Sequence, residues 1–378
     1  DGALGVAGLI TASGGATIAS SQNFTMGGQA TNDILISSDA SSTSDTVLVT
    51  AGYVNAHAGG GGGGTIAGSL SDNYIPIGSA ANTVSNFVLG LTEDDSIYIG
   101  TDPSATTNSA GNNTSLGINA LAAITTADDN TAIGYRSLYT LNTGINNVAV
   151  GSNAGSGVTT GGQNTVIGKE AGVSVGTHSH NTYVGYNAAI YHSGDNNVGL
   201  GSNALRTGSN DYNVAVGMSA MTKVSGGAGG VAVGFQSGYH PTGNYNTWLG
   251  YNAGFGSSAA SSQAAYTNVG IGKEALMSIT NGYDNTAVGV LAGATLTTGY
   301  YNTYIGKAAG SGATTAAHSN VGIGLSALSS AHGAGNVAIG RGALSNTTDA
   351  NQVAVGYSAL ESNTAGEKNT AVGYNALT

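Results

Sequence analysis

The chain has 378 residues, of which 64 are glycine, only four are phenylalanine and 7% are charged, with a formal net charge of −11. This composition excludes large packed globular cores and indicates a repetitive, fibrous protein. The chain has no cysteine, which excludes a disulfide framework, and its eight basic residues form no basic face, which disfavours binding to nucleic acid. No apolar run approaches the length of a membrane span, so we expect none in this segment.

The N-terminal third differs from the rest: residues 1–112 hold nine carboxylates and no Lys or Arg. Residues 1–58 contain short apolar runs between small polar turns and predict a small β region for connection or attachment. The glycine run 59–64 predicts a joint. Residues 65–112 contain apolar runs that end on glycine, such as Ile97-Tyr98-Ile99-Gly100, and predict a capping segment of atypical repeats. Because the chain starts without Met and stops inside a repeat, we expect it to be a piece of a longer protein.

Residues 113–378 repeat one short pattern, shown in full by the residues from Asn369 to Leu377, NTAVGYNAL. Aligning the copies on the glycine gives sixteen positions, spaced 16 to 18 residues apart with one gap of 22. They are Gly117, Gly134, Gly151, Gly168, Gly185, Gly201, Gly217, Gly234, Gly250, Gly272, Gly289, Gly306, Gly324, Gly340, Gly356 and Gly373. The period is too short for helical pairs or propeller blades. It predicts an all-β fold, a parallel β-roll or β-solenoid of about 16 coils.

Each column of the repeat predicts a structural role. The residue before the glycine is always Val, Ile or Leu, as at Val150 and Val288, and the residue three before it is always Thr or Val. Because these two positions lie on one face of a strand, we expect both to point inward and the residue between them to face solvent. Val288→Asp should therefore disrupt assembly more than Ala287→Asp.

Two further columns carry Asn and small residues. Asn stands four before the glycine in fourteen copies, as at Asn130 and Asn181, and fails only at Gly230 and Gln352. Stacked asparagines predict a hydrogen-bonded ladder. The glycines, such as Gly168 and Gly306, and the Ala column that includes Ala376 indicate places where backbones approach closely. One coil offers a thin core, so we expect partner chains to complete it, with the Ala and following Leu columns as the interchain face.

The columns Asn-Thr/Val-x-aliphatic-Gly-x-x-Ala, over residues 113–378, resemble the head repeat of trimeric autotransporter adhesins. Longer runs such as Asn369 to Leu377 resemble bacteriophage tail-fibre proteins, and residues 45–58 resemble a connecting segment of such fibres. The resemblance implies a left-handed β-roll in a homotrimeric fibre. It also implies a rigid spacer with an adhesive or receptor-binding surface, located in the tail fibre of a virion. The alternative is a trimeric adhesin on a bacterial cell surface.

A third alternative is a polysaccharide-degrading β-solenoid enzyme, because such enzymes carry carboxylate pairs in a groove. The carboxylates of the repeats fall in or beside turns and rarely share a column, so we expect no catalytic residues, metal or cofactor. His178, His180 and His192 lie within about one coil and could approach as a metal site, but without a carboxylate or cysteine they indicate solvated histidines.

The expected partners are other copies of the chain and a host polysaccharide or protein. Candidate contact residues are Tyr183, Trp248 and Tyr304 in the predicted outward column, Tyr251 after its glycine, and Phe255. Aromatic side chains with one polar edge suit sugar or protein surfaces, and the alternative is mutual stacking that stiffens the rod. About five extra residues within 254–266 predict a loop near Trp248 that either touches a receptor or is a tolerated insertion on a spacer.

Overall fold

A computed structural model describes residues 90–91, 96–100 and 109–378, apart from residues 224–225, 241–242, 258–263, 314, 331 and 365. All of these belong to the unit Thr65–Thr378. The predicted N-terminal β region, the joint and most of the capping segment lie outside the described residues. Of the capping segment, the described strand Ile97–Ile99 pairs in register with the first full repeat and so extends the repeat by one copy.

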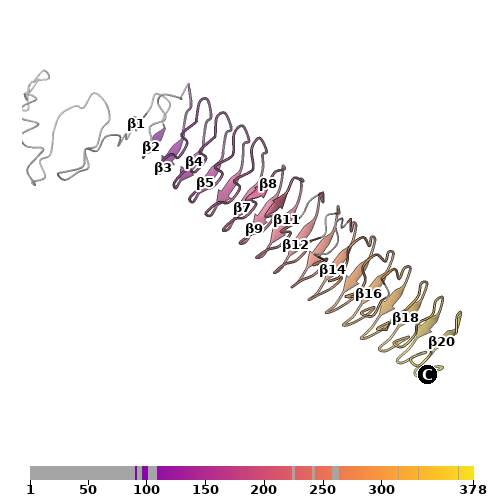
Figure 1. The fold of residues 1–378 in the computed structure, drawn as a ribbon. Helices are drawn as coiled ribbons and strands as arrows, with labels where there is room; N and C mark the ends of the chain where they lie inside the picture. Colours follow the sequence, from indigo (N-terminus) through magenta and orange to yellow (C-terminus); the bar gives the residue numbers. More distant parts are fainter. Residues whose placement is uncertain are drawn as a thin grey trace, which may run out of the picture. The chain divides into compact units, whose positions relative to one another are not determined.

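The described residues form β-strands and turns without a helix, and the predicted parallel β-solenoid is confirmed (Figure 1). One large sheet holds eighteen strands: the short β1 (Gly90–Leu91), which is antiparallel to β2, and seventeen three-residue strands in parallel register. Each coil contributes one of the latter, which are β2 (Ile97–Ile99), β3 (Thr114–Leu116), β4 (Thr131–Ile133), β5 (Val148–Val150), β6 (Thr165–Ile167), β7 (Thr182–Val184), β9 (Val198–Leu200), β11 (Val214–Val216), β12 (Val231–Val233), β13 (Thr247–Leu249), β14 (Val269–Ile271), β15 (Thr286–Val288), β16 (Thr303–Ile305), β17 (Val321–Ile323), β18 (Val337–Ile339), β19 (Val353–Val355) and β20 (Thr370–Val372). A second pair, β8 (Tyr191–His192) and β10 (Thr207–Gly208), is parallel as well.

The glycine column ends every three-residue strand with a sharp corner. Gly168 has a φ of 129° and Gly306 a φ of 132°, a region that side chains disfavour. A Cβ on Gly168 would lie 2.4 Å from the carbonyl oxygen of Gly185, its counterpart in the next coil. Conformation and close packing therefore both require glycine here, as the sequence predicted.

The predicted asparagine ladder is confirmed and lies inside the molecule. The backbone N–H and side-chain amide of Asn130 both donate to Asn113 Oδ1, at 3.0 and 3.1 Å, and the amide also donates to the Gly144 carbonyl at 3.0 Å. Asn181 makes the equivalent bonds to Asn164 and Gly194. These buried amides thus satisfy backbone groups of their own coil and of the neighbouring coil, which fixes the coils in register.

The ladder is interrupted where the sequence departs from the pattern. The Gly230 N–H still donates to Asn213 Oδ1 at 3.0 Å, but Gly230 offers no side-chain acceptor to the next coil. The position of its missing side chain is filled by Met221, whose Cε would lie 2.6 Å from a Cβ on Gly230. A flexible methionine therefore replaces the absent amide.

The predicted facing of the strands is wrong. The middle residue of each three-residue strand is buried, as Ala149 and Ala287 are. The residues that follow them, Val150 and Val288, are only half-buried. A three-residue strand directs only its central side chain across the narrow coil, towards the opposite wall. The Ala and Leu columns form that wall and are buried within the chain, so they are not available as an interchain face. Ala376, in the last coil, packs against the same core and is half-buried.

Three large central residues are accommodated by glycine in the next coil, while a fourth, Tyr98, is paired with Ser115. Tyr183, Trp248 and Tyr304 are at most 1% exposed, and their partners on the following strand are Gly199, Gly270 and Gly322. A Cβ on Gly270 would lie 2.8 Å from Trp248 Cε3. The core is thus filled by a large side chain in one coil and a glycine, without a side chain, in the next.

Candidate ligand-binding surfaces

The five predicted contact residues do not form one site. Tyr183, Trp248 and Tyr304 lie inside the coils, so their expected outward placement is wrong. Tyr251 is 48% exposed. Phe255 is half-buried, and the centroid of its ring lies 5.3 Å from that of Tyr239; neither residue belongs to a strand. Only these two reach the surface.

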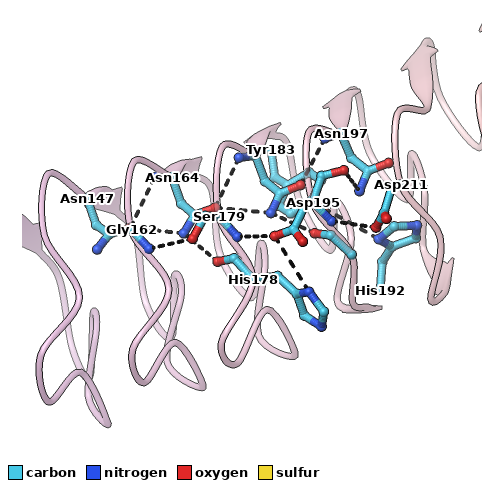
Figure 2. Close-up of polar contacts among 12 residues, drawn as sticks. Asn147, Gly162, Asn164, His178, Ser179, Tyr183, His192, Asp195, Asn197 and Asp211 are labelled. Carbon is cyan, nitrogen blue, oxygen red and sulfur yellow. Dashed lines mark hydrogen bonds and ion pairs between the residues drawn. The ribbon is translucent and has the colours of Figure 1, made fainter.

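The buried phenol of Tyr183 meets a buried histidine. Tyr183 Oη lies 3.4 Å from His192 Nδ1, and His192 occupies a position that holds Ile124, Leu141 or Val158 in earlier coils (Figure 2). Burial, with a smaller contribution from His178, lowers the pKa of His192 to about 4, so the ring is neutral at pH 7. Both side chains are buried inside the coil without access for a ligand, and among the described residues His192 Nε2 has no hydrogen-bond partner there.

The second buried aromatic repeats this arrangement. Tyr304 Oη lies 2.8 Å from His332 Nε2, and His332 Nδ1 lies 2.8 Å from the Ser330 carbonyl oxygen. Because a carbonyl only accepts, Nδ1 carries the proton and Nε2 accepts from the phenol. Burial raises the pKa of both tyrosines and lowers that of His332, so these groups stay neutral.

The turn before the asparagine carries a second ladder, of carboxylate and hydroxyl groups (Figure 2). Ser179 Oγ accepts from the Gly162 N–H at 3.0 Å, Asp195 Oδ1 from the Ser179 N–H at 2.6 Å, and Asp211 Oδ1 from the Asp195 N–H at 2.8 Å. Each side chain thus satisfies a backbone donor of the preceding coil. These carboxylates have a structural role that accounts for their position.

The three neighbouring histidines have different surroundings. His178 Nδ1 lies 3.6 Å from Asp195 Oδ1, His180 is exposed, and His192 is buried beside Tyr183. Among the residues that the structure describes, no three His, Asp or Glu side chains are placed to hold a metal ion.

The column after the glycine is an exposed row of aromatic, basic and apolar side chains. Tyr135, Tyr186 and Tyr251 are each about half exposed. The rings of Phe235 and Tyr251 stack at 5.3 Å, and Lys273 Nζ lies 5.8 Å from the Tyr251 ring. Stacking between coils is therefore real in this column, as the stiffening alternative predicted.

The outer face of the sheet carries an apolar column along its length, because the last residue of each three-residue strand is Val, Ile or Leu, whereas the first is Thr in eight of the seventeen strands. The residues at both ends of each strand point outwards, and many remain more than a third exposed, among them Ile97, Leu116, Ile133, Val148, Ile167, Leu249, Ile305, Ile339 and Val372. Because every coil adds a Val, Ile or Leu at the same outward position, these side chains form a contiguous apolar stripe, and such stripes mark interaction surfaces.

A last surface was missed by the sequence analysis. Tyr266, Tyr283, Tyr300 and His318 occupy the turn position two before the asparagine in four successive coils, where earlier coils have Ser179, Asp195 and Asp211. Three tyrosines at one offset in consecutive copies were the available signal. We call these four rings the turn stack.

Comparisons with protein-family models and with curated proteins give no match. The fold therefore defines the class, a parallel β-solenoid repeat protein, and any function must be argued from its surfaces. In the described part of the chain there is no helix that could cross a membrane.

Proposed function

We propose that this chain is a structural fibre protein, a rigid spacer that self-associates as a homotrimer and presents an adhesive surface, most simply in a phage tail fibre. The observation that carries the proposal is the apolar outer face of the sheet. A contiguous apolar stripe is unfavourable in water, and a second and third copy of the same stripe provide matching partners. The resemblance of the repeat to tail fibres and trimeric adhesins supports the number three.

The rest of the surface supports a non-enzymatic role. Several carboxylates of the described turns accept hydrogen bonds from backbone N–H groups, as Asp195 and Asp211 do. The buried histidines are held in tyrosine pairs inside the coils. These groups are therefore used for holding coils together.

Native mass measurement tests the assembly. We expect the protein to be a trimer, and Leu249→Asp with Ile305→Asp should give a lower oligomer that keeps its β circular dichroism, because both side chains are exposed in the single chain. Ala316→Asp, in an exposed turn away from this face, is the matched control and should leave the trimer intact. A monodisperse monomer of the unaltered protein would reject the proposal.

The reading frame around this segment distinguishes the two settings. A self-cleaving chaperone segment downstream would support a phage fibre, and a C-terminal membrane anchor would support a bacterial surface adhesin.

A further inference from the structure

The turn stack is a regular column of aromatic rings. Ring centroids are 4.9 Å apart between Tyr266 and Tyr283, 4.9 Å between Tyr283 and Tyr300, and 4.8 Å between Tyr300 and His318, with interplanar angles of 2° to 3°. The backbones of the three tyrosines are bridged in the same order. The ring spacing equals the spacing of adjacent strands, so the parallel rings form one offset stack that follows the direction in which the coils stack.

Tyr301 lies flat on the edges of two of these rings. Its centroid is 5.5 Å from that of Tyr283 and 5.2 Å from that of Tyr300, at angles of 87° and 86°. Perpendicular rings this close make an edge-to-face contact. Because Tyr301 meets two stacked rings from the side, their edges contact one of its faces. The ring remains 55% exposed, so its other face is open to solvent.

The column of Tyr301, directly before the asparagine, carries unusual residues in this region. Its members have positive φ throughout, and Asn146, Asn196 and Asn351 are residues suited to that conformation. Tyr212 adopts it at a φ of 62°, and Tyr245, Thr267 and Tyr301 adopt it at φ of 59°, 54° and 58°. A β-branched or aromatic residue is disfavoured there by sterics. Three such residues within four successive coils are therefore poorly explained by stability and indicate a use for their side chains.

The four residues Tyr245, Thr267, Asp284 and Tyr301, which we call the turn track, place two polar groups between two aromatic ones. Tyr245 is 65% exposed, and Thr267 Oγ1 donates to Asp284 Oδ1 at 2.5 Å. At one coil per strand spacing, the two tyrosines lie about 14 Å apart, the length of a short oligosaccharide. Flat aromatic faces pack on the C–H faces of sugar rings, and a carboxylate between them accepts from hydroxyl groups.

We propose that the turn track binds a neutral glycan, with Tyr245 and Tyr301 under sugar rings and Asp284 accepting hydrogen bonds from vicinal hydroxyls. The track contains a carboxylate and no Lys or Arg, which opposes an anionic polysaccharide. The inference rests on the proposed adhesive role and names its ligand class and its site. The turn stack holds Tyr301 in place, so the aromatic platform is formed before the glycan arrives and little side-chain freedom is lost on binding.

The test uses the assembled full chain on an array of printed microbial and neutral oligosaccharides. We expect binding to neutral glycans, reduced at least about tenfold by Tyr301→Ala and by Asp284→Ala. Tyr135→Ala, which removes an equally exposed tyrosine from another column, should leave binding unchanged. Circular dichroism and native mass show whether each variant still folds and assembles, and Tyr301→Phe, which keeps the flat face, should retain most of the binding.

The other outcomes overturn the proposal. These are no binding across the array, binding confined to anionic glycans, or binding that Tyr301→Ala leaves unchanged in an assembled protein. Attachment to cells that resists periodate but is lost after protease treatment would identify a protein partner and also reject the glycan. In each case a trimer measured in solution leaves the proposed fibre standing, so the two proposals fail separately.

Discussion

The two faces of the solenoid sheet follow different rules of substitution. On the inner face, Trp248 is possible because Gly270 follows it in the next coil, and Tyr304 is possible because Gly322 follows. On the outer face, Val, Ile and Leu replace one another at the strand ends, and Thr, Val and Ile at the strand starts, without any such pairing. On the inner face, the residue allowed in one coil therefore depends on the residue at the same position in the next coil. On the outer face, each position allows its own set of residues whatever the neighbouring coil carries.

Placing a carboxylate on each face of one strand should give the largest contrast. Ala287→Asp buries an unpaired charge and should destabilise the coils by about 4 kcal/mol or more. Val288→Asp, whose side chain is half-buried in the single chain, should cost the coils themselves about 1 kcal/mol and weaken the proposed trimer contact instead. Urea unfolding followed by circular dichroism measures both. If Val288→Asp unfolds the coils as readily as Ala287→Asp, the two faces do not differ as described.

The pairing of coils on the inner face can be measured by a double-mutant cycle. Trp248→Ala should cost about 3 to 5 kcal/mol by leaving a cavity, and Gly270→Ala about 1 kcal/mol or more because its Cβ would lie 2.8 Å from the indole. Together they should cost less than their sum by about 1 to 2 kcal/mol. Trp248→Ala with Gly322→Ala is the control and should be additive, since Gly322 lies against Tyr304.

The buried pair of Tyr183 and His192 should make the stability of the fold sensitive to acid. Burial lowers the pKa of His192 from its ordinary value of 6.5 to about 4 in the folded chain, so the unfolded chain binds the proton more readily. The stability that comes from the neutral ring is complete above pH 6.5 and falls as the pH drops towards 4, by about 3 kcal/mol. His332 contributes in the same direction.

Urea midpoints between pH 7.5 and 4 test this dependence. His192→Leu should remove a large part of it, while His180→Gln, at an exposed position, should not. A pH profile that His192→Leu does not alter would show that this histidine is not the acid-sensitive group.

The smallest effect is expected from substitutions that repair the interrupted asparagine ladder. Gly230→Asn alone places its Cβ against Met221, whereas Gly230→Asn with Met221→Leu restores the residues of the other coils and should stabilise by about 1 kcal/mol. Thermal unfolding of the single and double variants measures this. A double variant less stable than either single variant would show that the coil is adapted to its methionine.

The sequence predicted the features that depend on one column. Glycine at Gly168 and the amide at Asn130 are required in nearly every coil, so their constancy indicated their roles. The facing of the strands was wrong because variability in the middle column looked like solvent exposure. Tyr183 and Gly199 compensate one another across two coils, and a column read by itself cannot show that. The turn stack extends over four coils at the position two before the asparagine, so no single copy of the repeat shows it.

The glycine column also has a consequence for how the gene can change. Every coil meets the next through the same backbone contact, as Gly117 meets Gly134 and Gly134 meets Gly151. Excising residues 118–134 would bring Gly151 onto Gly117 with the same chemistry on both sides of the junction. Unequal recombination between the repeated DNA segments can therefore alter the reach of the protein in steps of about 4.8 Å without a new interface having to evolve.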